Sequence, residues 1–370
     1  MSMVQGIGSS GRGPGGRGLR RRTVVSLLVG IGALVGSAQA GPVPDYDFDW
    51  AVIGDINNPA MDGADIDYSM RGRGSVGYRY RISKNEVTTA QWLEFVNSYS
   101  TQSDKMRWFG APSFWGARLD SSYSGPGNRW VLRTDVENAS RLPVFSISWR
   151  DAARYVNWLH NGKGTSLSAI ANGAYDTSTF TEQDDGDFIT FNDQRTRSAG
   201  ARFWIPSLDE WVKAAHYEPR NLDGTGGRWW RYVDGGEDIL VPGLPEDGGQ
   251  TTVGMEAFSN GEWIFDKPLG MYEDVVSPWG LLDVSGGASE WTEEIEGIGG
   301  RAEHRVYDGG PAGGWPGQID RLDEWNFASP FHAPLTGLRI ASTVPSPGPL
   351  GGLLAASSTL LRRRKRCRGT

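Results

Sequence analysis

The sequence predicts one loop-rich domain in which short helices and strands are joined by long connections. Three observations lead to this prediction: the 370 residues include 52 glycines, they include 16 tryptophans, and regular apolar periodicity is confined to short runs. Glycine favours turns and irregular backbone, whereas large aromatic side chains supply buried area where regular elements are few. We expect this domain to run from residue 49 to residue 342.

The charge of the chain is unevenly distributed. The net charge is −7, yet residues 1–40 carry five arginines and residues 345–370 carry six lysines and arginines, with no acidic residue in either segment. The remainder has 26 basic and 44 acidic residues, a net charge of −18. This acidic body argues against nucleic acid as a partner and fits a soluble secreted protein.

The N-terminal 40 residues have the pattern of a secretory signal peptide. Arginines between residues 12 and 22 precede an apolar run over residues 24–35, and Ala38-Gln39-Ala40 then offers a small-residue cleavage site. The apolar run is well short of the ~20 residues that span a bilayer, which disfavours a membrane anchor. We therefore expect export and cleavage by signal peptidase. Residues 41–48 are a linker by composition.

The first regular elements of the domain are a strand and two helices. Residues 78–82 alternate in polarity and predict a strand. Thr88 favours the start of a helix over residues 89–99, and a period of 3.6 predicts a second helix over residues 150–160.

A third helix is predicted over residues 208–216. Ser207 and Glu210 at its start match a capping box, in which the hydroxyl and the carboxylate each satisfy a backbone N–H group. Residues 161–200 and 218–265 lack periodicity and are rich in Gly, Asp, Asn and Thr, so we expect long surface loops. Such loops often carry function, although they can also be tolerated insertions.

Six short blocks occur in a fixed order along the domain. They are Lys84-Asn85-Glu86-Val87-Thr88; Pro143 to Trp149 with Asp151-Ala152; Ile205 to Trp211; Gly280 to Gly286 with Glu290-Trp291; Gly309-Gly310 with Trp315; and Gly337-Leu338-Arg339. The series resembles the sulfatase-modifying-factor family, whose founding member is the formylglycine-generating enzyme. The resemblance covers residues 49–342 and implies an α+β, C-type-lectin-like fold, loop-rich and built as a single domain.

The resemblance also implies structural roles for residues of these blocks. It places the tryptophans of the blocks in the core and Arg339 in a buried salt bridge. The residues to which we assign a structural role are Glu86, Trp149, Asp151, Glu210, Trp211, Trp291, Trp315 and Arg339.

In relatives, the turn that matches Gly280 to Trp291 binds calcium. Matched residue by residue, Glu290 is the side-chain ligand, with the carbonyls of Gly286 and Ala288 as further candidates. Calcium takes six to eight oxygens, and a glycine-rich turn can direct carbonyl groups toward an ion. The alternative is that Glu290 caps backbone N–H groups or pairs with an arginine such as Arg339.

The oxidase chemistry of the family is not expected here. Relatives that make formylglycine bind copper through a cysteine pair, and soft thiolates select Cu(I). The one cysteine of this chain, Cys367, lies outside the domain, and its four histidines are scattered, so we expect neither copper nor iron. The sequence thus leans away from an enzyme.

Tryptophans outside the blocks are candidates for ligand contact. Exposed aromatic side chains beside polar ones suit stacking on sugar rings or on peptides. The cluster Trp229, Trp230 and Tyr232 is the first candidate. The alternative is that such side chains fix long loops to the body of the domain.

The C-terminal residues 343–370 have three parts: a proline-containing motif, a short apolar stretch, and a basic cluster over residues 362–366. This layout resembles the bacterial PEP-CTERM sorting signal, which an exosortase-type membrane protease processes. The alternative is a basic tail of no particular structure. In both cases Cys367 lies in this tail.

These observations favour an exported, non-catalytic protein at the cell surface or in the extracellular matrix. It would bind an extracellular polysaccharide or a surface protein through residues 161–200 and 218–265. One rival hypothesis is a formylglycine-generating or related oxidase that modifies exported sulfatases. The other is a purely structural matrix protein.

Overall fold

The computed structural model describes most of the predicted domain. All described residues lie in one compact unit within Pro42–Thr370, and they are residues 43–63, 66–184, 186, 189–259, 261–298, 302–331 and 334–345. The predicted signal peptide, most of the sorting tail, Cys367 and His332 lie outside these residues. Within the described part of the chain, no helix combines the length and the apolar character needed to cross a lipid bilayer.

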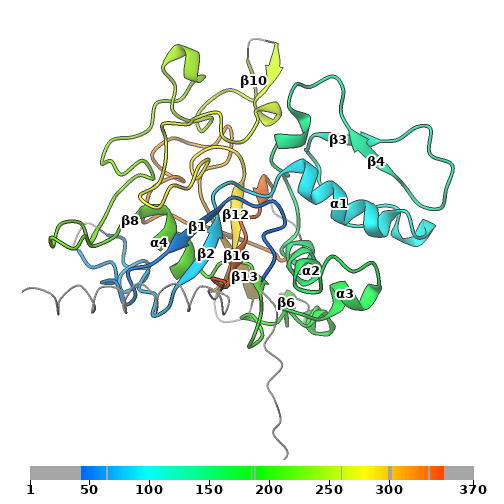
Figure 1. The fold of residues 1–370 in the computed structure, drawn as a ribbon, viewed down its shortest axis with the longest axis horizontal. Helices are drawn as coiled ribbons and strands as arrows, with labels where there is room; N and C mark the ends of the chain where they lie inside the picture. Colours follow the sequence, from blue (N-terminus) through cyan, green and yellow to red (C-terminus); the bar gives the residue numbers. More distant parts are fainter. Residues whose placement is uncertain are drawn as a thin grey trace, which may run out of the picture. The chain divides into compact units, whose positions relative to one another are not determined.

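One four-stranded antiparallel sheet joins the beginning and the end of the domain. Its order is β1 (Trp50–Ile53), β2 (Tyr80–Ser83), β16 (Ala341–Ser342), β7 (Phe203–Trp204) (Figure 1). The second strand confirms the predicted strand over residues 78–82 with a shift of two residues at its start. The sheet places the last strand of the domain between the second and the seventh.

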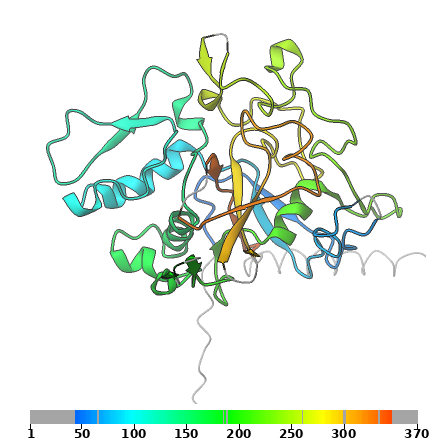
Figure 2. The ribbon, with the colours of Figure 1, turned by 180° about the vertical axis from the view of Figure 1, so that it is seen from behind.

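A second four-stranded sheet contains the longest strands. Its order is β14 (Asn326–Ala328), β13 (Ala302–Asp308), β12 (Ser289–Ile298), β15 (Thr336–Gly337), and only the β12–β15 pair is parallel. The β12–β13 pair, in yellow and orange, is clearest from behind (Figure 2). Its register shifts between Trp291 and Ile295, which bends the strand.

The three predicted helices are confirmed, as α1 (Thr89–Ser100), α2 (Trp149–His160) and α4 (Leu208–His216). Each begins at a hydroxyl side chain that accepts a hydrogen bond from the third residue of its helix, as an N-cap does. Both α1 and α4 carry a complete capping box, and that of α4 is the predicted pair of Ser207 and Glu210.

The two predicted loops contain more regular structure than expected. They hold a short helix, two 3₁₀ turns and hairpins, because elements of two to five residues are too short to show a period in sequence. The elements concerned are α3 (Leu167–Ala171), η3 (Thr177–Thr179), β5 (Glu182–Asp184), β6 (Ile189–Phe191), β9 (Arg228–Trp229), which pairs with β8 (Tyr217–Glu218), η4 (Pro245–Asp247), β10 (Phe258–Ser259) and β11 (Glu262–Trp263).

Further short elements complete the domain. A hairpin packs beside α1, and three more 3₁₀ turns mark the ends of connections. They are β3 (Ala117–Leu119), β4 (Trp130–Leu132), η1 (Asp104–Met106), η2 (Ala139–Arg141) and η5 (Ile264–Asp266).

Tryptophans of the blocks fill the core, with one exception. Of these, Trp149, Trp211 and Trp291 are fully buried, and Trp92 of α1 and Trp158 of α2 are buried beside them. The prediction for Trp315 was wrong, because this side chain is 70% exposed. Near Trp315 in the sequence, the buried residue is Ala312, which packs with Phe145 and Ile264. The Gly314 N–H donates to the Pro311 carbonyl at 2.9 Å, which closes a turn over residues 311–314, and Trp315 follows this turn with its side chain exposed.

The segment predicted as a linker packs against the domain over its described residues. Asp45 forms an ion pair with Arg81, and the ring of Tyr46 lies 5.4 Å from that of Phe203. Phe48 is buried. Residues 43–48 are thus an outer layer on the first sheet.

Candidate functional site

Two charged residues of the blocks form a buried ion pair. Glu290 and Arg339 are 1% and 0% exposed, and the Arg339 Nη2 lies 2.8 Å from the Glu290 Oε1. The Trp211 indole N–H also donates to this carboxylate, at 2.6 Å. The guanidinium donates further to the backbone carbonyls of Ser83 and Leu282. The predicted salt bridge of Arg339 is therefore confirmed.

This pairing leaves little for a calcium ion. Each carboxylate oxygen of Glu290 already accepts two hydrogen bonds, from Arg339 or Trp211. Calcium prefers carboxylate oxygens with free coordination sites. Glu290, the side-chain ligand of the predicted set, has both oxygens engaged and does not fit the ion, so we propose no calcium at this place.

Two further buried carboxyl groups surround the pair. Glu86 accepts the Ala288 N–H with both oxygens, at 3.0 and 3.2 Å. Burial and then the nearby Glu290 charge raise the pKa of Glu86 well above its usual range. Asp283 accepts the Gly270 N–H at 2.7 Å, and burial raises its pKa to about 6. Both groups bind backbone within the fold, which is a structural role.

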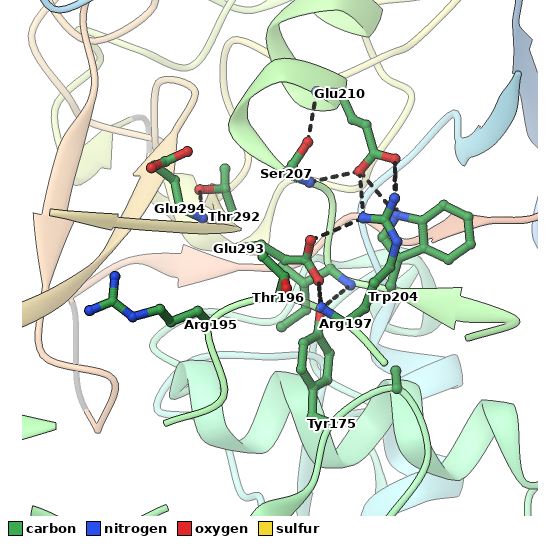
Figure 3. Close-up of polar contacts among 12 residues, drawn as sticks. Tyr175, Arg195, Thr196, Arg197, Trp204, Ser207, Glu210, Thr292, Glu293 and Glu294 are labelled. Carbon is green, nitrogen blue, oxygen red and sulfur yellow. Dashed lines mark hydrogen bonds and ion pairs between the residues drawn. The ribbon is translucent and has the colours of Figure 1, made fainter. Parts of the chain in front are cut away.

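A second polar centre lies at the start of α4 (Figure 3). Arg197 lies between the carboxylates of Glu210 and Glu293, 3.0 Å from each, and its guanidinium stacks over the Trp204 ring. The Tyr175 hydroxyl donates to Glu293 at 2.7 Å. Burial raises the pKa of Glu293 to about 7, against the lowering effect of Arg197. Every one of these groups is paired with another.

The remaining predicted structural residues also act within the fold. Asp151 accepts a hydrogen bond from Ser148, which caps α2, and pairs with Arg154. The Trp149 indole N–H donates to the carbonyl of Thr292, and that of Trp291 donates to the carbonyl of Ile147. These contacts tie α2 to the second sheet.

The histidines of the described chain lie apart from one another. His160 accepts the N–H of Arg202, and His216 contacts the Trp230 carbonyl at 3.2 Å. Burial lowers the pKa of both, that of His216 to about 4. Among the described residues, no three side chains of His, Cys, Asp or Glu are grouped to hold a metal ion.

A cavity of about 430 Å³ opens beside Trp229, and we call it the Trp229 cavity. Its walls come from three separate segments of the chain. Apolar and charged side chains line it in nearly equal numbers: Pro59, Met61, Asp62, Ile66, Trp229, Arg231, Glu237, Leu322 and Asp323 are among its lining residues. Cavities of this size and character are typical of small-ligand sites.

The three predicted ligand residues have different positions. Trp229 lines the cavity, but its indole N–H donates to the carbonyl of Pro59, and a side chain at Gly74 would collide with its ring. Trp230 lies under the guanidinium of Arg228, 3.6 Å from it. Tyr232 is 3% exposed. Only Trp229 is placed to contact a ligand, and it also fixes its loop to the body.

A second cavity, of about 580 Å³, lies at the β10–β11 hairpin, and we call it the hairpin cavity. Phe258 and Trp263 line it and are 53% and 51% exposed. Arg133 and Lys267 lie in its wall. Unlike Trp229, these two aromatic side chains are free over half of their surface.

Sequence reasoning missed most of the residues that build these cavities. Met61 and Leu322 lie far from Trp229 in sequence, and no local pattern connects them. For the hairpin cavity a signal did exist. Two aromatic residues flank Gly261, which takes a φ of +84°, and such a glycine between short apolar segments is typical of a hairpin turn.

The chain is similar to one protein family over most of its length. The family model described as the sulfatase-modifying factor enzyme 1-like domain matches residues 72–344. Among curated proteins, none matches this chain.

Solved structures with a similar architecture are distant in sequence. CarF is 18% identical with a TM-score of 0.48, over 82% of this chain and 99% of that chain. Variable protein 1 of Treponema denticola is 17% identical with a TM-score of 0.46, over 80% and 95%. PvdO from Pseudomonas aeruginosa is 16% identical with a TM-score of 0.39, over 80% and 94%.

Proposed function

This chain belongs to the sulfatase-modifying factor enzyme 1-like family, and from that membership we propose that it is an exported ligand-binding module that carries out no catalysis. A fold does not determine an activity, which depends on the site. The blocks shared with the family are the scaffold in this proposal. The loops between them are the binding surface.

The Trp229 cavity is the observation that carries the proposal. Its lining combines an aromatic wall with charged groups, and its residues lie on loops, whereas Glu290, Glu210 and Glu293 are all paired inside the scaffold. A cavity with an apolar wall and a few polar groups can hold one unit of a larger ligand. We take an extracellular polysaccharide as that ligand, at the cell surface or in the matrix.

Export and surface sorting belong to the same proposal. The signal peptide over residues 1–40 and the three-part tail over residues 343–370 support them. Sorting would place the binding surface outside the cell, where polysaccharides are the abundant polymers.

The rival enzyme is a formylglycine-generating or related oxidase. Its copper chemistry requires thiolates, and the sequence has only Cys367. We expect the mass of a sulfatase-type cysteine peptide to stay unchanged after incubation with the purified chain and oxygen. A loss of the thiol mass in favour of an aldehyde would replace the proposed function with the oxidase.

The test of the proposed function is binding of the purified chain to a panel of bacterial polysaccharides and surface proteins, with calcium and then with a chelator. We expect binding that does not depend on calcium. Asp62→Lys, which changes the charge in the Trp229 cavity, should weaken it, whereas Glu273→Lys at an exposed acid outside both cavities should not. Failure to bind any ligand of the panel would overturn the proposal.

A further inference from the structure

We propose that the hairpin cavity is a second binding site, specific for glycans that carry no acidic groups. The inference rests on the proposed function, because it names the ligand class of a binding module. The hairpin cavity is separate from the Trp229 cavity, so variants in each cavity test the two proposals separately. The hairpin cavity combines an exposed aromatic surface, a rigid support beneath it, fixed polar groups and a net negative charge.

The aromatic surface consists of Phe258 and Trp263. They are cross-strand partners in the β10–β11 hairpin, and their rings meet edge to face with centroids 5.6 Å apart. Each is about half exposed. Aromatic rings offer large, rigid, amphipathic contact area, which suits the C–H face of a sugar ring. Two such rings at an angle can contact two faces of one glycan.

The hairpin is held in place by the residue that follows it. Ile264 is buried and packs with Phe145 and Ala312, and its N–H donates to the Ala257 carbonyl at 3.1 Å. Ile264 thus attaches the hairpin to the core, whereas Trp263 stays exposed at the surface. A surface fixed before binding loses little conformational entropy when a ligand arrives.

Fixed polar groups line the same cavity. Arg133 and Asp266 form a bidentate pair with distances of 2.6 and 3.0 Å, and the same guanidinium donates to Asp135 at 2.9 Å. Lys267 pairs with Glu262. Held in this way, the guanidinium and carboxylate groups present donors and acceptors in defined directions, as neighbouring sugar hydroxyl groups require.

The charge of the cavity determines the class of glycan. Four acidic side chains line it, Asp135, Glu137, Glu262 and Asp266, against two basic ones, Arg133 and Lys267. Both cations are already paired with acids of the cavity. A uronic acid or sulfated sugar would meet net negative charge with no unpaired cation, and like charges at an interface cost affinity. Neutral and amine-bearing sugars avoid this cost.

The volume is consistent with a short stretch of such a polymer. At about 580 Å³ the cavity is within the range of roughly 300–1,000 Å³ that small ligands occupy. Its open side allows the remainder of a chain to continue across the surface.

The experiment measures binding of the purified full chain to three glycan groups by calorimetry: neutral glucans, amino-sugar oligomers and uronic acid oligomers. We expect neutral or amino-sugar oligomers to bind and uronic acid oligomers to bind at least tenfold more weakly. Trp263→Ala should weaken the binding about tenfold or more. Trp315→Ala removes a still more exposed tryptophan that lines neither cavity and should have no effect. Thermal melts establish that both variants fold.

Charge reversal tests the class directly. Glu137→Lys replaces an acid of the cavity by a base and should raise the affinity for uronic acid oligomers relative to that for neutral oligomers. Equal binding of acidic and neutral oligomers by the wild type would overturn the inference, as would unchanged affinity in Trp263→Ala.

The two proposals fail in different ways. If glycans bind and only Asp62→Lys weakens them, the hairpin inference is wrong and the proposed function stands. The same holds if the chain binds peptides or proteins but no glycan. If the chain binds no ligand of any kind, both are wrong.

Discussion

At the scale of single residues, the buried polar groups of the scaffold differ in how they are balanced. Glu290 and Arg339 neutralise each other and satisfy nearly all of their hydrogen bonds within the chain. Burial raises the pKa of Asp283, and the Gly270 N–H and the charges of Arg339 and Arg141 offset this only in part. Removing Arg339 should therefore lower the stability of the fold, whereas replacing Asp283 by a neutral residue should raise it at neutral pH.

We expect Arg339→Gln to lower the free energy of unfolding by about 3–5 kcal/mol, because it leaves the Glu290 charge buried without its partner. Urea denaturation followed by tryptophan fluorescence measures this. The matched control is Arg107→Gln, which breaks the solvent-exposed pair with Asp104 and should cost little stability. Equal effects of the two variants would contradict the interpretation.

Asp283 predicts a dependence of stability on pH. Its pKa is about 6 in the folded protein against an ordinary 3.8, so the folded state holds this proton more tightly. The contribution of this carboxyl group to the free energy of unfolding is fully present below pH 3.8. It falls by about 3 kcal/mol in all as the pH rises through 6. Asp283→Asn keeps the acceptor for the Gly270 N–H, and asparagine tolerates the φ of +57°.

We therefore expect Asp283→Asn to melt at a higher temperature than the wild type at pH 8 and at a similar temperature at pH 4. Melting curves across this range provide the measurement. Parallel curves for the two proteins would show that this carboxyl group is not the cause.

At the scale of elements, a helix or strand could be predicted from the sequence when it was long enough to show a period and began at a capping residue. The three long helices have a period and a capping hydroxyl, and their bounds followed from the sequence within one or two residues. The hairpins β8–β9 and β10–β11 have strands of two residues, which are too short for a period. Tertiary contacts such as those of Ile264 form them instead.

The caps themselves can be tested. Ser207→Ala removes the hydroxyl that accepts the Glu210 N–H at the start of α4, and we expect a loss of about 1 kcal/mol of stability. Ser166 stands at the same position of α3 but makes no capping hydrogen bond, so Ser166→Ala should cost little. Denaturation curves of both variants give the comparison. A larger loss in the Ser166 variant would refute the role of the capping box.

At the scale of the whole molecule, the order of the blocks predicted the fold, because six short motifs in sequence constrain a topology that none constrains alone. The same blocks misplaced Trp315, since a glycine-rich match does not say which residue of a turn is buried. The candidate site was predicted only at Trp229. Its partners on residues 59–66 and 322–323 meet it through the fold, which no local pattern reveals.

The pairing of Glu290 also predicts how the whole domain responds to metal removal. Because its carboxylate is occupied by Arg339 and Trp211, we expect a chelator to leave the melting temperature unchanged. Calorimetry with and without added calcium tests this. A drop in melting temperature that calcium restores would require a metal site that holds the fold together.

The position of β16 has a consequence for biogenesis. This strand is formed by residues 341–342 and lies between β2 and β7, so the first sheet stays incomplete until nearly the last residue of the domain has left the ribosome. Contacts of such long sequence separation form slowly. We therefore expect the nascent polypeptide to lack a complete first sheet until the end of synthesis, and a product that ends before Ala341 to lack the strand that joins β2 to β7.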